Sequence, residues 1–372
     1  MLLGLPPAGV FGQLDGAGKD RSTDGRLEGE LEFLNEGPVE MDTAFGEELD
    51  GRLYTSLDRL SGSDLLIPAE RFYLRTRASK LLPPEHTWKI AVGGLVAAPL
   101  RLRIAELRAR AKPLGRHLME CSGNTRAAHF GMISVGEWAG IPMNEIVADA
   151  KVKTSATQIL VSGFDRYAGN SVSSTPGASW IFKLDELWQA KAFVATELNG
   201  KPLSRDHGAP VRLVVPGWYG CSCIKWVDQI SLVDDSTKAT SQMAEYATRT
   251  HQSGSPRLAK DFVAARIEHA AMPIRVEKWR VGGSLSYRVV GLLWGGTQSI
   301  GRLGIRFNPE EEYVHVETLP TPQTSPWTLW THQWHPAERG TYTIRLAILE
   351  PQLHPRRLEA GYYARSVEIA EV

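Results

Sequence analysis

The sequence predicts an α+β domain followed by an all-β sandwich. Short strand-like and helical segments alternate from Ile67 to about Ile230, which is typical of an α+β domain. From Ile274 onward the pattern is purely strand-like, which is typical of a sandwich. The length of 372 residues allows two packed cores, since a domain takes roughly 150 residues.

Residues 1–65 are rich in Gly, Asp, Glu and Leu and have no sustained periodicity. We expect them to form an irregular leader that wraps the first domain or is partly mobile. The stretch from Met1 to Phe11 has neither a basic region nor a twin arginine, so a signal peptide is not expected. No apolar run approaches the roughly 18 residues that cross a bilayer. The expected location is therefore cytoplasmic.

Residues 66–245 are the expected first domain. The β-branched run from Val211 to Val215 ends at Pro216 and Gly217, which predicts a strand followed by a turn. Between Lys183 and Ala192 the apolar residues have helical spacing, which predicts a short helix.

Residues 260–372 are the expected second domain, and the polar stretch from Ser236 to Lys260 is the predicted boundary. Apolar and other residues alternate from Leu303 to Asn308 and again from Tyr342 to Leu349. Several such strands, separated by turns that contain Gly and Pro, predict a β-sandwich.

Composition and charge exclude several classes of protein. Hydrophobic residues make up 42% and charged residues 23%, as in soluble globular proteins. The formal net charge is zero, so no long-range field favours nucleic acid or a membrane surface, and anion binding requires a local cluster. The three cysteines, Cys121, Cys221 and Cys223, make a poor disulfide framework and lack zinc-finger or covalent-haem spacing.

The first segment with chemical character runs from Glu120 to Arg126. Cys121 lies beside Gly123 and Asn124, which indicates a tight turn, and Arg126 would favour the thiolate form. A thiolate can attack a substrate or bind a metal. A buried, inert cysteine at a turn is the alternative, because free cysteines are often buried.

The second segment runs from His207 to Trp226 and places His207, Arg212 and Lys225 around one strand and one Gly-rich turn. Backbone N–H groups in such a turn can form a concave anion site, and Arg and Lys supply the charge that a phosphate needs. Alternatively, Arg212 and Lys225 are solvated strand residues and His207 is a turn residue.

Together these segments resemble the sulfite oxidase family. The stretch from Cys121 to Arg126 resembles that family's Cys-Ala-Gly-Asn-Arg-Arg. Residues from Glu197 to Gly208 resemble its Glu-Met-Asn-Gly and Arg-Asp-His-Gly motifs, and the match continues from Pro210 to Gly217 and at Lys225-Trp226. A weaker resemblance extends from about Ile67 to the C-terminus. The chain is identified as a member of this family, with its molybdopterin-binding domain followed by an immunoglobulin-like sandwich.

The resemblance implies a molybdenum centre held by one molybdopterin and by the Cys121 thiolate, with no haem. A soft thiolate suits this metal, and the cofactor performs the redox step. By matching position, the residues expected to bind the cofactor are Phe72, Tyr73, Leu74, Arg75, Asp165, His207, Arg212, Cys223, Ile224 and Lys225.

The resemblance also implies an arginine cluster that receives an oxyanion substrate, at Arg75, Arg126 and Arg365. Guanidinium groups bind such oxygens bidentately. The sequence departs from the family at Thr196, which replaces an active-site tyrosine, and at Thr76 and Arg77, which replace two pterin contacts. In the shortened loop after Arg126 a family tryptophan is missing and His129 is present. Cys221 has no role in the family and is interpreted as a structural residue.

The implied function is oxygen-atom transfer, with oxidation of sulfite to sulfate as the main hypothesis. The substrate is then a small oxyanion or oxide. Electrons pass to a separate acceptor, such as a cytochrome c-like protein or oxygen. The alternatives are a sulfoxide or N-oxide reductase on the same fold, a scaffold that has lost the cofactor, and a cysteine hydrolase. Residues from Val289 to Gly296 resemble the start of the family's dimerisation domain, so a homodimer is expected, without nucleic-acid or membrane partners.

Overall fold

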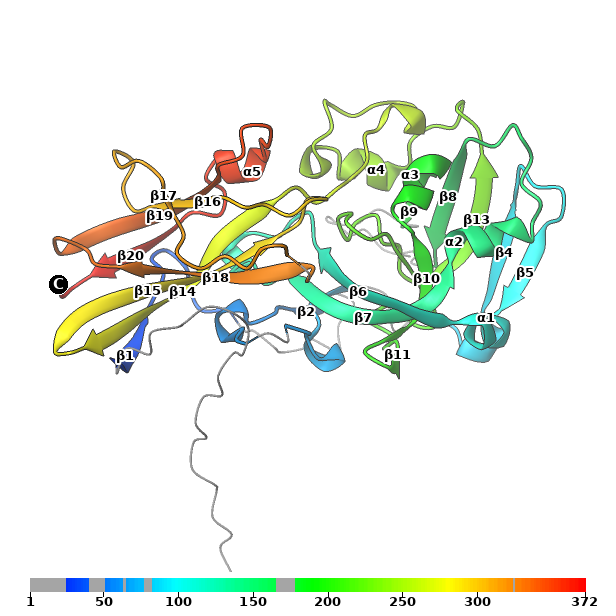
Figure 1. Ribbon diagram of the computed structural model, residues 1–372. Coiled ribbons are helices and arrows are strands. Elements are labelled where there is room, and N and C mark those ends of the chain that lie inside the picture. The colour runs from blue at the N-terminus through cyan, green and yellow to red at the C-terminus, as the bar shows by residue number, and fades with distance from the viewer. Residues whose placement is uncertain (1–24, 40–50, 63–64, 77–81, 165–177, 324) are drawn as a thin grey trace, which may run out of the picture.

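The computed structural model describes residues 25–39, 51–62, 65–76, 82–164, 178–323 and 325–372. The described residues form two halves, which lie side by side (Figure 1). Strand is the main secondary structure in both halves, and the helices are few and short. None of the described helices is long and apolar enough to span a bilayer.

The first half contains two five-stranded sheets. One has the order β11-β10-β7-β6, with β12 paired to β10, and the other has the order β5-β4-β13-β8-β9. Neighbouring strands are antiparallel except for β13 and β4, which are parallel. The strands of the first sheet are β6 (Lys112–Glu120), β7 (Ile133–Pro142), β10 (Phe193–Leu198), β11 (Lys201–Pro202) and β12 (Arg212–Val214). Those of the second are β4 (Lys89–Gly94), β5 (Leu100–Arg103), β8 (Gln158–Gly163), β9 (Ser179–Lys183) and β13 (Val227–Val233).

The α-helices described in this half are only five to seven residues long. They are α1 (Ile104–Arg110), α2 (Met143–Ala148), α3 (Leu184–Gln189) and α4 (Ser241–Glu245). The predicted helix at 183–192 is confirmed as α3, and the predicted strand at 211–215 is confirmed as β12. The α+β description holds only in part, because the half is mostly sheet.

The second half contains two four-stranded antiparallel sheets, one over the other (Figure 1). One has the order β1-β14-β15-β18 and the other β17-β16-β19-β20. The strands of the first sheet are β1 (Gly25–Leu31), β14 (Ala270–Val281), β15 (Ser284–Trp294) and β18 (Trp327–Trp334). Those of the second are β16 (Leu303–Arg306), β17 (Val314–His315), β19 (Gly340–Ile348) and β20 (Arg365–Ile369), and helix α5 (Arg356–Glu359) precedes β20. The predicted all-β half is therefore confirmed.

The prediction of an irregular leader is wrong for residues 25–31, which form β1. This strand pairs with the C-terminal half of β14. Gly25 faces Val281, and Leu31 faces Val276. Glu28 of β1 forms an ion pair with Arg280 of β14, with 2.6 Å between Oε1 and Nε. The two glycines of β1 obscure the strand pattern in the sequence, and its partner is distant along the chain.

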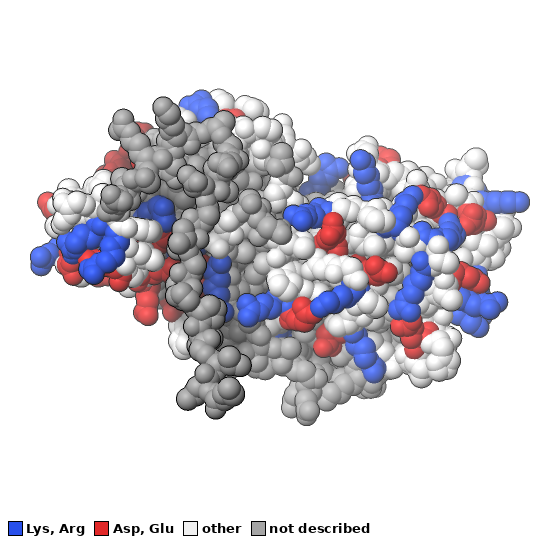
Figure 2. All heavy atoms as spheres, turned by 60° about the horizontal axis from the view of Figure 1, so that its bottom comes forward, with Lys and Arg blue, Asp and Glu red and all other residues white. Residues whose placement is uncertain are grey.

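The two halves share one core. Their buried apolar side chains form a single cluster, and the end of β6 lies at the junction of the halves (Figure 1). A short antiparallel pair, β2 (Gly51–Leu53) and β3 (Leu74–Thr76), places Arg52 opposite Arg75. On the face in Figure 2, basic and acidic side chains are interspersed over most of the surface, in keeping with the zero net charge.

Candidate active site

Cys121 begins the loop that joins β6 to β7. Its backbone N–H donates to the Met132 carbonyl at 2.9 Å, and its carbonyl accepts from the Asn124 N–H at 2.9 Å. The buried Asn124 side chain accepts from the Met132 N–H at 3.0 Å and donates to Glu120 at 3.3 Å. These bonds fix the loop, so the half-buried thiol has a defined position.

The electrostatic surroundings of this thiol are mixed. Burial raises the pKa of Cys121, while the Gly123 N–H and the guanidinium groups of Arg75 and Arg249 lower it. Without further positive charge the thiol is therefore the favoured form, since a buried thiolate is poorly solvated. A bound cation would reverse that balance, because a coordinating thiol loses its proton.

The segment around β3 lines the site beside Cys121. Arg75 is partly exposed, and its charge acts on the Cys121 thiol. Tyr73 is buried, interacts electrostatically with both Cys121 and Arg212, and donates its backbone N–H to Ser134 Oγ at 2.8 Å. A β-carbon on Gly220 would lie 2.6 Å from the Tyr73 hydroxyl, so the turn after β12 also closes on this tyrosine. Phe72 and Leu74 are buried in the core.

His207 is a buried, neutral imidazole. Nε2 lies 3.0 Å from the Phe72 carbonyl and Nδ1 lies 2.8 Å from Ser204 Oγ. A carbonyl can only accept, so Nε2 carries the proton. Burial, with a smaller contribution from the charges of Arg212 and Lys225, lowers the pKa of His207 to about 4. Both ring nitrogens thus have protein partners in this structure.

Arg212 is a buried cation without a carboxylate among its described partners. Nη1 donates to the His207 carbonyl at 3.0 Å, and Nη2 lies 3.2 Å from both the Cys223 carbonyl and Met119 Sδ. Nε is buried and has no hydrogen-bond partner. A buried charge that meets only neutral groups favours binding of an anion.

Lys225 lies close to this cation. Its Nζ donates to the carbonyls of Arg75 and Asp206, both at 3.1 Å, and stands 4.3 Å from the centre of the Trp226 ring. Cys223 is buried, and its thiol accepts from the Val215 N–H at 3.4 Å. Ile224 is buried and accepts from the Leu213 N–H. The turn therefore presents two cations near His207, as an anion site requires.

The arginines predicted to receive the substrate do not all gather at Cys121. Arg126 donates to the Ala364 carbonyl. Arg365 is buried in a bidentate ion pair with Glu36, with 2.7 Å between Nε and Oε1, and it also donates to the Pro273 carbonyl at 3.0 Å. The charge of Arg75 lowers the pKa of Cys121. Arg365 is therefore accounted for as a structural residue.

Of the other candidate positions, the structure describes Thr196, His129 and Cys221. Asp165 and Arg77 fall outside the described residues. Thr196 is fully buried, and its hydroxyl has no hydrogen-bond partner. His129 Nε2 lies 2.8 Å from the Gly37 carbonyl. The Cys221 pKa is raised by burial, in keeping with a structural residue of the turn.

Sequence reasoning missed Arg249. This residue lies in a 3-10 turn (Thr248–Thr250) within the polar stretch interpreted as a domain boundary. Its charge lowers the pKa of Cys121. No sequence signal distinguished it from the other polar residues of that stretch.

The donor set fits a pterin-held molybdenum. Arg212 offers a buried, unpartnered N–H to an anion, and Cys121 offers one soft sulfur. Among the described residues no group of three or more His, Cys, Asp or Glu side chains could hold a metal alone. A metal at Cys121 would therefore need most of its ligands from a cofactor.

Comparisons with known proteins agree with this donor set. A family model described as the oxidoreductase molybdopterin binding domain matches residues 79–241. Mitochondrial sulfite oxidase of Rattus norvegicus is 26% identical over 251 residues, covering 61% of this chain and 45% of that protein. Sulfite oxidase of Gallus gallus is 25% identical over 304 residues, covering 74% of this chain and 64% of that protein. An NADPH nitrate reductase of Fusarium oxysporum is 26% identical over 161 residues, covering 40% of this chain and 17% of that protein.

A solved structure has the same fold. It is the sulfane dehydrogenase SoxCD from Paracoccus pantotrophus, with a TM-score of 0.64 and 18% identity. The match covers 92% of this chain and 90% of that chain. The chain spans less than two thirds of the sulfite oxidases it resembles, 45% of the rat protein and 64% of the chicken protein.

Proposed function

Since this chain belongs to the sulfite oxidase family of molybdopterin-binding oxidoreductases, we propose that it oxidises sulfite to sulfate by oxygen-atom transfer. The observation that carries the proposal is the half-buried Cys121 thiol with the Arg75 charge beside it. The buried Arg212, which lacks a described counterion, supports it. In such an arrangement the thiol can bind a metal and the neighbouring cations can bind an anion.

In this proposal Cys121 binds the metal and the His207 turn holds the anionic end of the cofactor. Arg212 and Lys225 supply the charge, and the neutral His207 orients Arg212 through its carbonyl. When bound, the cofactor supplies the oxygen-transfer chemistry and takes up two electrons. The protein contributes binding, orientation and fixed charge.

Arg75 is the proposed substrate-binding cation. Its guanidinium is partly exposed, so an oxyanion can reach it from solvent. Its charge would attract sulfite and orient it toward the metal, which is a contribution from positioning. We propose a cytochrome c-like protein or oxygen as the separate electron acceptor.

A reductase acting on sulfoxides or N-oxides is the second candidate. It is favoured by Thr196, which replaces the family's active-site tyrosine and has a buried hydroxyl without a partner. Nitrate reductases are also among the similar proteins. An assay that includes a sulfoxide and an N-oxide beside sulfite separates the two candidates.

We further propose that the pair of C-terminal sheets is an immunoglobulin-like dimerisation domain. The two four-stranded antiparallel sheets support this assignment. Sedimentation of the purified protein at micromolar concentration tests it, and a monomer would contradict it.

Molybdenum analysis and steady-state turnover test the main proposal. We expect about one molybdenum per chain in the unaltered protein. Cys121→Ser should lose at least about 100-fold in turnover with a retained fold, because the thiolate ligand is gone. Cys221→Ser is the matched control and should keep both metal and turnover. Absence of molybdenum in the unaltered protein, or full turnover in Cys121→Ser, would overturn the proposal.

A further inference from the structure

Arg249 places a second guanidinium beside Cys121. A β-carbon built on Gly123 would lie 3.5 Å from Arg249 Nη1 and 3.8 Å from Cys121 Sγ. The cation and the thiol therefore face the same small space over the Cys121 loop. Gly123 leaves that space open because it has no side chain.

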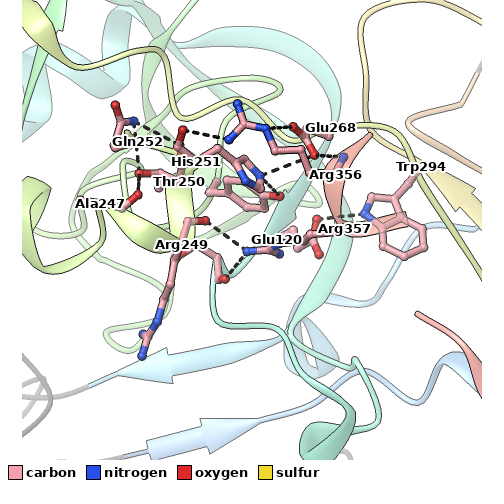
Figure 3. Close-up of polar contacts among 12 residues, drawn as sticks. Glu120, Ala247, Arg249, Thr250, His251, Gln252, Glu268, Trp294, Arg356 and Arg357 are labelled. Carbon is pink, nitrogen blue, oxygen red and sulfur yellow. Dashed lines mark hydrogen bonds and ion pairs between the residues drawn. The ribbon is translucent and has the colours of Figure 1, made fainter. Parts of the chain in front are cut away.

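The backbone that carries Arg249 is held firmly (Figure 3). Arg357 of α5 donates from Nη2 to the Arg249 carbonyl at 3.1 Å and to the Ser122 carbonyl at 2.8 Å. One guanidinium from the second half thus joins the Arg249 segment to the Cys121 loop. Thr250 adds a hydrogen bond from its hydroxyl to the Tyr246 carbonyl at 2.9 Å. These hydrogen bonds restrain the backbone from which the Arg249 side chain extends.

The guanidinium of Arg249 remains available to a ligand. It is exposed and stands 5.6 Å from the centre of the Tyr246 ring. Among the described residues, no carboxylate pairs with this guanidinium and no side chain forms a hydrogen bond with it. Figure 3 shows its side chain leading away from the polar network that holds its backbone.

The other arginines expected near the metal have different partners. Arg126 donates to the Ala364 carbonyl, and Arg365 is paired with Glu36. The charges of Arg75 and Arg249 both act on the Cys121 thiol. Two cations that flank one site can hold the separate oxygens of a small oxyanion.

We propose that Arg249, together with Arg75, binds the oxyanion substrate beside Cys121. This inference rests on the proposed function and adds to it a substrate residue from the segment between the two halves. It also assigns to Arg357 a positioning role, because Arg357 holds both the Arg249 carbonyl and the loop that carries the thiol.

The test compares Arg249→Met with the molybdenum-loaded, unaltered enzyme. Isothermal titration with sulfate should show affinity reduced roughly 10-fold, since a charge-assisted contact is lost. The KM for sulfite should rise by a similar factor with a smaller change in kcat. Arg249→Lys should recover part of the sulfate affinity. Molybdenum content should stay the same, because Arg249 is not a ligand.

Arg101→Met is the matched control. Arg101 is exposed on β5, in the same half of the protein as Cys121, and its variant should bind sulfate like the unaltered protein. Equal sulfate affinity in Arg249→Met and Arg101→Met, or no sulfate binding by the unaltered protein, would overturn the inference. Failure of the proposed function is distinguished by missing molybdenum or missing turnover in the unaltered protein, and sulfate titration still compares the variants in that case.

Discussion

At the scale of single residues, His207 is kept neutral by its surroundings. Burial is the main reason that its pKa falls to about 4, and the nearby charges of Arg212 and Lys225 add to the effect. A third positive charge in this cluster would repel the other two. The neutral ring instead accepts a hydrogen bond at Nδ1 and donates one at Nε2, which leaves the cations to bind an anion.

The lowered pKa of His207 predicts a pH-dependent stability. The unfolded chain takes up this proton near pH 6.5 and the folded chain only near pH 4. Between these values the unfolded state binds more protons, so the free energy of unfolding falls as the pH falls. The loss amounts to about 3 kcal/mol across the window. Urea unfolding at several pH values measures it.

His207→Asn should lack this part of the pH dependence. His315→Asn, which alters an exposed histidine of β17, should keep the slope of the unaltered protein. A His207→Asn variant whose stability falls as steeply between pH 6.5 and 4 would contradict the assignment.

The sequence predicted those site residues that lie in compact motifs. Cys121 was singled out because Gly123 and Asn124 beside it indicate a turn, and Arg212 because its strand leads into a Gly-rich turn. Arg365 was expected near the substrate, but its partner Glu36 is 329 positions away, and no local pattern reveals such a pair. Arg249 was missed because a single sequence does not distinguish an arginine that lies at a site from any other arginine of a polar loop.

At the scale of elements, strand β15 passes beneath a tryptophan of its neighbour. Gly291 of β15 faces Trp330 of β18 in the sheet register. A β-carbon on Gly291 would overlap the Trp330 ring, which is fully buried. The strand-like pattern after Ile274 predicted sheet in this region, but the need for glycine at position 291 depends on which strand lies alongside it, and the sequence alone does not identify that neighbour.

Gly291→Ala should therefore destabilise the protein by about 2–3 kcal/mol, because the added methyl group forces the Trp330 ring or the strand to move. Gly93→Ala is the control, since a β-carbon at Gly93 of β4 would meet no atom within 4 Å. Its effect should stay within about 1 kcal/mol. Chemical denaturation of both variants measures the difference, and equal stabilities would show that the ring can move freely.

At the scale of the whole molecule, the second half forms part of the support for the Cys121 loop. Trp294 Nε1 donates to Glu120 Oε2 at 2.9 Å, and the Tyr362 hydroxyl donates to the Asn124 carbonyl at 2.6 Å. Arg357 donates to the Ser122 carbonyl at 2.8 Å. The C-terminal half thus contacts the last residue of β6 and two residues of the loop that follows it. The sequence predicted two domains, but not this contact between them, because it joins residues more than a hundred positions apart.

Trp294→Phe tests whether the halves are energetically coupled. The change removes one donor from the buried Glu120 carboxyl and keeps an aromatic ring against Tyr363. Loss of a hydrogen bond to such a group should cost about 1.5–3 kcal/mol. If one core unites the halves, hydrogen exchange will show weakened protection in both β7 and β15.

Trp279→Phe is the control for the same chemical change. Trp279 Nε1 donates to Glu277 Oε2 at 2.9 Å, but this carboxylate also binds Arg275 and Arg288 within the second half. Since Glu277 keeps these partners, the loss should be smaller, about 1 kcal/mol or less. A Trp294→Phe variant in which only β15 loses protection would mean that the halves unfold independently. The second half would then not stabilise the Cys121 loop.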